Sequence, residues 1–278
     1  MRIYKYQGAG NDFLIADNRD GSLQLSAGQV ARLCDRRYGV GSDGLMLLES
    51  SDRYDFRMVY YNSDGSGGMM CGNGGRCIVA FAYDCGIRHF DFEAADGWHT
   101  AEIVSVESNS KIVRLKMKDV EGIAHHDALE GVSVDSEGSF LDTGTRHYVR
   151  FVDGLDSYDV VSEGRDIRYN AKELQPVGAN VNFVEPSDGY LKIRTYEKGV
   201  EDETYACGTG IVASCIAAYA GGKTPSWAEG GRVRYDVMAK KDSLSVDFIP
   251  AAEEIFPVRE VYLTGPAVFV AEIILPEM

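Results

Sequence analysis

The sequence contains one short pattern twice, and this repetition limits what the chain can fold into. Residues 71–77 read Cys-Gly-Asn-Gly-Gly-Arg-Cys, and residues 207–212 read Cys-Gly-Thr-Gly-Ile-Val. Each pattern opens an apolar run, over 77–83 in the first case and 211–220 in the second, and each run ends near glycine. An apolar run that starts at a turn and stops near glycine is typical of a buried helix. The sequence therefore predicts two buried helices, each with a cysteine at its N-terminus.

The segments before the two cysteines are also alike. An apolar strand over 56–61, then a polar residue and a loop, leads to Cys71, and a strand over 191–196 leads in the same way to Cys207. The cysteines are 207 − 71 = 136 positions apart in a chain of 278 residues. A repeat of this size predicts two similar domains, and a cleft between domains is a common location for a small-molecule site.

The remaining segments favour an α+β fold, because strand patterns alternate with few helical ones. We expect helices over 27–37 and 157–169, and separate strands over 259–263 and 267–275 near the C-terminus. The predicted domain boundaries follow the repeat. Residues 1–118 with 264–278 form an N-terminal domain with Cys71, and residues 119–263 form a C-terminal domain with Cys207.

Charge, apolar run length and cysteine spacing argue against nucleic-acid-binding, membrane and metal-binding proteins. The chain has 28 Lys and Arg against 43 Asp and Glu, for a net charge of −15. This sign opposes binding to nucleic acid and to anionic membranes. No apolar run approaches the roughly 20 residues that span a bilayer, and the N-terminus lacks the apolar core of a signal peptide. We therefore expect a cytoplasmic protein whose six cysteines are thiols, without the ligand spacing of a metal site.

The two predicted helix N-termini suit acid–base chemistry by thiols. A helix N-terminus exposes unpaired N–H groups and a partial positive charge, which lowers the pKa of a thiol from its usual value of about 8.5. Glycines after each cysteine let a carboxylate approach those N–H groups. If Cys71 and Cys207 face one another, a thiolate can remove a proton from one face of a carbon while a thiol supplies one to the other. The cysteines at 34, 77, 85 and 215 are expected to be buried structural residues.

Six short motifs, two of which contain the repeated cysteines, match the pattern of a known family. They are Gly-Ala-Gly-Asn-Asp-Phe at 8–13, Tyr-Asn-Ser-Asp-Gly-Ser at 61–66, the cysteine motif at 71–77, Gly-Ala-Asn-Val-Asn-Phe at 178–183, Tyr-Glu-Lys-Gly at 196–199 and Glu-Thr-Tyr-Ala-Cys-Gly-Thr-Gly at 203–210. With them the chain closely resembles the diaminopimelate epimerase family of cofactor-independent amino-acid epimerases. The resemblance implies two similar domains related by pseudo-symmetry, each a mixed, barrel-like sheet around a central helix. It also implies epimerisation of LL-2,6-diaminopimelate to the meso form, in lysine and peptidoglycan precursor synthesis, by an isomerase that is commonly a homodimer.

The resemblance also implies roles for individual residues. Cys71 and Cys207 would be the acid and base, and His147 and Glu197 would position groups and handle protons near the reacting carbon. The backbone at Gly72, Asn73, Gly208 and Thr209 would hold the α-carboxylate of the substrate. The other positions implied to contact the substrate are Asn11, Asn62, Thr145, Asn180, Glu197 and Lys198. No cofactor and no metal are implied.

This chain differs from the family's usual pattern at positions around the far end of the substrate. Thr145-Arg146 stands where Asn-Pro or Ser-Pro is usual, Lys198 where Arg is usual, and Gly44 where some members have Gln. A racemase of another amino acid, such as proline, hydroxyproline or histidine, therefore stays an alternative on the same fold. Two alternatives of other classes are a thiol–disulfide protein that uses Cys71 and Cys207 and a non-catalytic binding protein.

Overall fold

The computed structural model describes residues 1–252 and 254–276. It divides into two compact units, Met1–Lys116 together with the C-terminal segment from Thr264, and Met117–Leu263. Of the predicted domain segments, residue 253 and residues 277–278 lie outside the described part of the chain.

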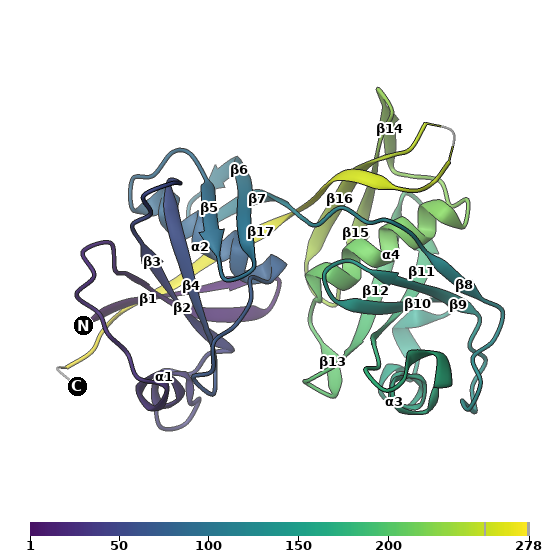
Figure 1. Ribbon diagram of the computed structural model, residues 1–278, viewed down its shortest axis with the longest axis horizontal. Coiled ribbons are helices and arrows are strands. Elements are labelled where there is room, and N and C mark those ends of the chain that lie inside the picture. The colour runs from purple at the N-terminus through teal and green to yellow at the C-terminus, as the bar shows by residue number, and fades with distance from the viewer. Residues whose placement is uncertain (253, 277–278) are drawn as a thin grey trace. The chain divides into compact units, whose positions relative to one another are not determined.

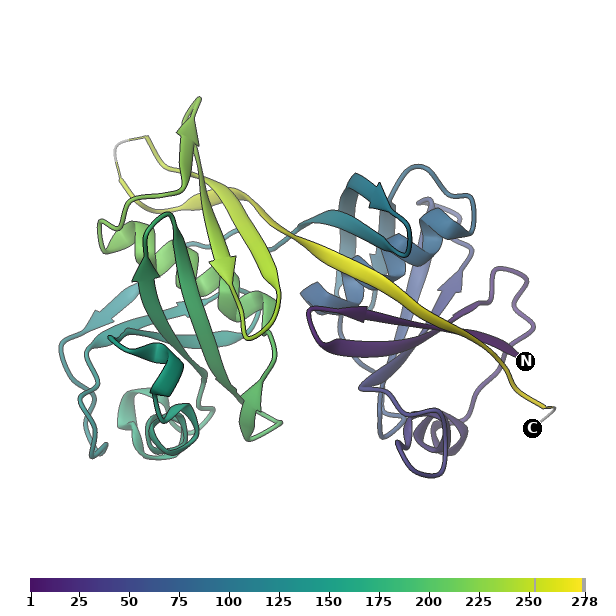
Figure 2. The same cartoon turned by 180° about the vertical axis from the view of Figure 1, so that it is seen from behind.

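The first unit is a closed barrel of eight strands, which are labelled in Figure 1. Each strand pairs with the next in chain order, and the C-terminal half of the last strand pairs with both the seventh and the first, which closes the ring. Figure 2 shows this last strand beside the first. The strands are β1 (Arg2–Gly8), β2 (Asn11–Asp17), β3 (Gly44–Glu49), β4 (Phe56–Asn62), β5 (Asp91–Ala94), β6 (Gly97–Glu107), β7 (Ser110–Lys116) and β17 (Val258–Ile274).

The helix α2 (Gly72–Asp84) lies at the centre of this barrel. All residues from Gly72 to Ala82 are buried, and the helix contacts β1, β2, β3, β6 and β7. A helix that is buried on every side must be covered on every side, and the ring of strands does this. The second helix of the unit, α1 (Ala27–Cys34), packs from outside with Val30 and Leu33 against a cluster that includes Leu14 and Leu45.

The second unit has a mixed sheet and its own central helix, α4 (Gly208–Ala220). Its strands pair in the order β8–β9–β10–β11–β12–β15–β16, with β13 on one end of β12 and β14 on β15. The helix contacts five of them and is buried from Gly210 to Ala218. The other elements are β8 (Ala124–His126), β9 (Gly138–Asp142), β10 (Arg146–Phe151), η1 (Leu155–Ser157), α3 (Val160–Asn170), η2 (Lys172–Leu174), β11 (Asn180–Ser187), β12 (Tyr190–Glu197), β13 (Asp202–Thr204), β14 (Trp227–Glu229), β15 (Arg232–Met238) and β16 (Ser243–Pro250).

The two units repeat one topology. In the first, β1–β2 is antiparallel, β2–β3 parallel, β3–β4 antiparallel, β4–β5 parallel and β5–β6 antiparallel. The pairs β9–β10, β10–β11, β11–β12, β12–β15 and β15–β16 alternate in the same way. The parallel crossovers contain α1 and α2 in one unit and α3 and α4 in the other. This confirms the predicted fold class of two similar units, each a mixed sheet around a helix.

One predicted helix and two predicted strands were wrong in extent. The helix expected over 27–37 ends at Cys34, because Asp35 is extended and its side chain accepts hydrogen bonds from the N–H groups of Arg37 and Tyr38. This local turn competes with the helix. The two strands expected near the C-terminus are one strand, β17, which continues through Pro266 where it pairs with β7.

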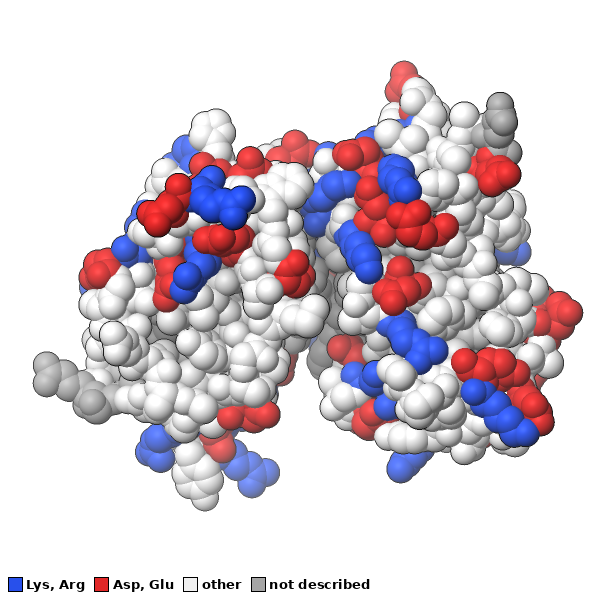
Figure 3. Space-filling view, viewed as in Figure 1, with Lys and Arg blue, Asp and Glu red and all other residues white. Residues whose placement is uncertain are grey.

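Charged side chains of both signs are interspersed on the face shown in Figure 3. Several charged side chains of the described chain form ion pairs, as in the contacts of Arg150 with Glu163 and of Arg114 with Glu102, each 2.9 Å long. None of the described helices is long and apolar enough to cross a membrane.

Candidate active site

Cys71 is the N-cap residue of α2. Its backbone is extended, with φ −114° and ψ 154°, and its half-buried Sγ accepts a hydrogen bond of 3.3 Å from the N–H of Gly74. A Cβ added at Gly74 would lie 3.3 Å from Sγ, closer than an ordinary contact. The glycines therefore allow the first turn of the helix to wrap closely around the sulfur.

Arg76 holds this first turn from inside the barrel. Its side chain is fully buried and donates to the carbonyl of Gly72 at 3.1 Å, to Asn73 Oδ1 at 3.0 Å and to the carbonyl of Pro266 at 3.3 Å. The guanidinium thus links the N-terminus of α2 to β17. This residue was not among the predicted site residues, although one charge within a mostly apolar helical segment is a sequence signal for it.

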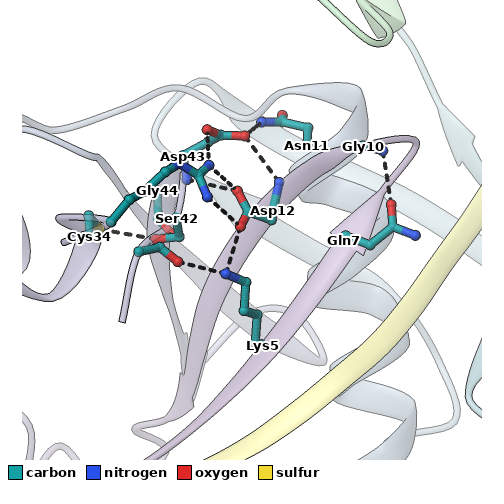
Figure 4. Close-up of polar contacts among 11 residues, drawn as sticks. Lys5, Gln7, Gly10, Asn11, Asp12, Cys34, Ser42, Asp43 and Gly44 are labelled. Carbon is teal, nitrogen blue, oxygen red and sulfur yellow. Dashed lines mark hydrogen bonds and ion pairs between the residues drawn. The ribbon is translucent and has the colours of Figure 1, made fainter. Parts of the chain in front are cut away.

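Asn11 lies at the turn between β1 and β2, within a network of charges (Figure 4). Its Nδ2 donates to Asp43 Oδ2 at 2.5 Å. Arg36 bridges Asp43 and Asp12, at 2.7 Å and 2.6 Å, and Lys5 contacts Asp12 at 2.8 Å. Because the amide nitrogen of Asn11 faces a carboxylate, its amide oxygen points the other way. The network therefore sets the orientation of a side chain that was predicted to bind substrate.

Asn62 ends β4 and pairs with Gly44 on β3. Its Nδ2 donates to Ser66 Oγ at 3.0 Å, so the amide is held within its own turn. A Cβ added at Gly44 would lie 2.5 Å from the Tyr60 ring. The space that a longer side chain would need at Gly44 is therefore occupied by Tyr60.

Cys207 is the N-cap residue of α4, with φ −100° and ψ 106°, and its side chain is buried. Its Sγ lies 3.5 Å from Oγ1 of Thr209, in the first turn of the helix. Thr209 Oγ1 in turn lies 3.0 Å from Thr145 Oγ1 and 3.0 Å from His147 Nε2. The structure thus brings three predicted site residues together beside Cys207.

His147 is completely buried on β10 between its neighbours β9 and β11. Burial lowers the pKa of the imidazole to about 3, against the opposing effect of the Asp142 carboxylate. The ring is therefore neutral at physiological pH. Asn182, which the sequence analysis missed, lies 3.1 Å from Nδ1. A signal was available, because Asn180 and Asn182 are two positions apart on a strand and so share one face.

Asn180, Glu197 and Lys198 lie together where β10, β11 and β12 meet. Asn180 Nδ2 donates to the carbonyl of Arg146 at 3.1 Å, and Asn180 Oδ1 accepts from the N–H of Lys198 at 2.9 Å. Glu197 Oε2 accepts from Thr204 Oγ1 at 2.7 Å. The side chain of Lys198 is exposed. The structure therefore places these three near each other, with Asn180 as the tie between neighbouring strands.

Burial makes the thiols of the other four cysteines weaker acids than an exposed thiol. It raises the pKa of the Cys85 thiol to about 11, and it raises the pKa values of Cys34, Cys77 and Cys215. Thiols with raised pKa values are poor nucleophiles and bases at neutral pH. No group of three His, Cys, Asp or Glu side chains able to hold a metal ion occurs among the residues that the structure describes.

Solved structures of several enzymes share this fold. The chain aligns over 99% of its length with 99% of a PhzF-family phenazine biosynthesis protein from Bacillus anthracis, at TM-score 0.73 and 17% identity. It aligns over 99% of its length with 92% of a probable proline racemase from Agrobacterium radiobacter, at TM-score 0.67 and 14% identity. A duplicated mixed sheet around a central helix thus defines the fold class.

The sequence comparisons define the family within this class. The family model for diaminopimelate epimerase matches residues 3–122 and 139–270. The diaminopimelate epimerase of Flavobacterium psychrophilum is 45% identical over 98% of this chain and 99% of its own length. That of Chlorobaculum tepidum is 46% identical over 94% and 95%. The chain belongs to the diaminopimelate epimerase family.

Proposed function

We propose that this protein is an isomerase that converts LL-2,6-diaminopimelate to meso-diaminopimelate by inversion at one α-carbon, without a cofactor. Two observations, taken together, support this proposal most strongly. The chain belongs to the family over nearly its whole length, and Cys71 and Cys207 each occupy the N-cap of the central helix of a repeated unit. Of the alternatives, the full-length identity of 45% favours diaminopimelate over another amino acid.

In the proposed mechanism Cys71 and Cys207 act as a thiolate and a thiol on opposite faces of the α-carbon. The thiolate removes the α-proton and becomes a thiol, while the other thiol gives its proton to the opposite face and becomes a thiolate. The first N–H groups of an α-helix have no intrahelical partner, and the helix dipole favours negative charge there. The backbone at Gly72, Asn73, Gly208 and Thr209 would hold the α-carboxylate and stabilise charge that develops on it.

The remaining site residues are proposed to orient the substrate. Asn11 and Asn62 in one unit, and Thr145, Asn180 and Lys198 in the other, would contact the far end of the diamino diacid. His147 and Glu197 would position groups around the reacting carbon. Lysine at 198 offers a point charge to a carboxylate where arginine would offer a planar fork, so this contact would differ from the family's usual one.

The biological setting follows from the proposed reaction. We propose a cytoplasmic enzyme of lysine and peptidoglycan precursor synthesis that works as a homodimer on a small amino acid. Nucleic acid and membranes are not among its proposed partners.

The proposal is tested by incubating the purified, reduced protein with LL-diaminopimelate and following formation of the meso isomer by chiral chromatography. Parallel reactions contain L-proline, trans-4-hydroxy-L-proline and L-histidine. We expect conversion of LL-diaminopimelate at the highest kcat/KM of the four. Conversion of one of the other amino acids with a higher kcat/KM would instead assign the chain to a different substrate on the same fold.

A further inference from the structure

Asn182 is a buried polar residue with every polar atom of its amide engaged. It lies on β11 and is fully buried. Its Oδ1 accepts a hydrogen bond of 2.9 Å from Thr195 Oγ1 on β12, and its Nδ2 lies 3.1 Å from the carbonyl oxygen of Tyr148 and 3.1 Å from His147 Nδ1. Such an amide has one orientation that satisfies all three neighbours.

The carbonyl of Tyr148 decides which way the amide of Asn182 points. A backbone carbonyl can only accept hydrogen bonds, so the NH₂ group must face it and the amide oxygen must face Thr195. The second N–H of the same NH₂ group then points to His147 Nδ1. That ring nitrogen must be an acceptor, which leaves the proton of a neutral imidazole on Nε2.

The proton on Nε2 faces two hydroxyl groups, of which Thr209 contacts Cys207. Thr145 Oγ1 lies 2.9 Å and Thr209 Oγ1 3.0 Å from Nε2, and the two hydroxyls lie 3.0 Å apart. The imidazole can donate to the Thr145 hydroxyl, which then donates to the Thr209 hydroxyl. Thr209 can in turn donate to Cys207 Sγ at 3.5 Å. When the sulfur is a thiol, rotation of the same hydroxyl lets it accept from S–H instead.

We propose that Asn182 is a positioning residue that holds His147 in the Nε2–H tautomer, so that the imidazole and the Thr145 hydroxyl support the hydroxyl of Thr209 as a reversible hydrogen-bond partner of Cys207. The inference deepens the proposed function, because it assigns Cys207 both a thiolate and a thiol state during turnover. In this arrangement His147 donates a hydrogen bond and takes no net proton.

The packing around His147 supports a neutral ring with a defined orientation. Burial lowers its pKa to about 3, and the Asp142 carboxylate at the end of β9 opposes this effect. Cys207 at the start of α4 is linked to the ring through Thr209 Oγ1. Position 210 has no side chain, and a Cβ there would lie 2.3 Å from Asn182 Oδ1 and 3.3 Å from His147 Cε1. The first turn of α4 therefore closes directly over the Asn182–His147 pair.

The first test needs only the unaltered protein. Two-bond proton–nitrogen correlation spectra of ¹⁵N-histidine-labelled protein distinguish the two tautomers of each ring, and a His147→Gln sample identifies the signals of His147. We expect a protonated Nε2 and an unprotonated Nδ1, unchanged from pH 8 down to about pH 5, well above the lowered pKa. A protonated Nδ1, or a doubly protonated ring in this range, would overturn the inference.

The second test changes the partner of Nδ1. Asn182→Asp replaces the donor by a carboxylate, which favours a proton on Nδ1 and a positively charged ring. We expect His147 to titrate within about pH 5–8 and kcat for diaminopimelate to fall at least about tenfold with a smaller change in KM. Asn170→Asp, at the exposed end of α3, is the matched control and should change neither.

Thr195→Val is the second variant, in case Asn182→Asp does not fold. It removes the hydrogen bond that orients the Asn182 amide but leaves the NH₂ group in place. We expect signals from both tautomers of His147 and a smaller fall in kcat. Unchanged tautomer and kcat in every folded variant would overturn the inference. If the unaltered protein does not epimerise diaminopimelate but shows the Nε2–H tautomer, the proposed function fails and the positioning of His147 stands.

Discussion

Gly210 and Gly28 are both helical glycines, but their surroundings are opposite. A Cβ at Gly210 would lie 2.3 Å from Asn182 Oδ1, whereas a Cβ at Gly28 in α1 would meet nothing within 4 Å. Glycine costs helix stability in both places, so its presence at 210 needs a local reason. That reason is the amide of Asn182, which occupies the space of the missing side chain.

The two glycines therefore make a matched pair of substitutions. Gly28→Ala should raise the free energy of unfolding by roughly 0.5–1 kcal/mol, because alanine restricts the unfolded chain and favours helix. Gly210→Ala should lower it by about 1–3 kcal/mol, because the methyl group overlaps a fully packed amide. Urea unfolding at neutral pH measures both. Equal effects of the two changes would show that the close approach at Gly210 is not present in solution.

The cysteines provide the corresponding test for activity. Cys71→Ala or Cys207→Ala should abolish epimerisation in both directions, because each removes one of the two proton carriers. Cys77→Ala changes a buried thiol in the same helix as Cys71 and should leave most of the activity. Rates with LL- and meso-diaminopimelate are compared after circular dichroism has shown that each variant is folded. A Cys77 variant as inactive as the other two would refute the choice of catalytic cysteines.

Local sequence patterns predicted some residues of the candidate site but missed others, whose contacts are distant in sequence. Cysteine before Gly-x-Gly and an apolar run is a local pattern, so Cys71 and Cys207 could be placed at helix N-termini from sequence alone. Asn182 and Asp43 act through partners far away in sequence. Asp43 contacts Asn11 across 32 positions and Asn182 contacts His147 across 35. Such pairings depend on strand register, which the sequence did not determine.

At the scale of elements, β1, β2 and the loop after α1 are held together by one charge network. Asp12 on β2 contacts Lys5 on β1, and Arg36 joins it to Asp43 in the loop before β3 (Figure 4). Burial alone would raise the pKa of Asp12, but Arg36 and Lys5 outweigh it and lower the pKa to about 2. The early end of α1 at Cys34 places Arg36 in this loop, and the helix expected over 27–37 would not have done so.

The lowered pKa of Asp12 gives a pH dependence with a definite sign. The carboxyl is ionised in the folded state down to about pH 2 but only down to about 3.8 when unfolded, so its contribution is present above pH 3.8 and is lost as pH falls towards 2. Asp12→Asn should therefore lower the free energy of unfolding at pH 7 and flatten its fall between pH 4 and pH 2, relative to the unaltered chain. Urea unfolding across pH 2–7 measures this.

The control for this pH dependence is Asp52→Asn, which changes an exposed aspartate in the turn before β4. Its unfolding curve should follow that of the unaltered protein at every pH. If Asp12→Asn showed the same acid dependence as the unaltered protein, the network would contribute nothing to stability.

At the scale of the whole molecule, β17 belongs to both units. Its first residues, up to Leu263, lie in the second unit, and from Thr264 it closes the barrel of the first between β7 and β1. Sequence patterns predicted strands on both sides of Pro266 but not their continuity, because proline usually interrupts a strand. Pro266 is tolerated within the pairing with β7, where its carbonyl accepts from Arg76.

The closing role of β17 predicts how fragments behave. Residues 1–118 alone would have the unpaired edges of β7 and β1, and such edges favour aggregation. Residues 264–278 attached through a flexible Gly/Ser linker should restore a monomeric fragment with cooperative thermal unfolding, measured by circular dichroism and size-exclusion chromatography. Cooperative unfolding of residues 1–118 without the added strand would contradict the proposed N-terminal domain.

The proposed reaction has two cysteines exchange protons with opposite faces of one carbon. It is tested most directly by the position of deuterium early in the reaction of LL-diaminopimelate in heavy water, measured by mass spectrometry of the separated isomers. Two bases predict one solvent deuterium at the inverted carbon of the meso product and little in the recovered LL substrate. Equal deuterium in substrate and product from the first turnovers would indicate a single base and rule out the two-cysteine reaction.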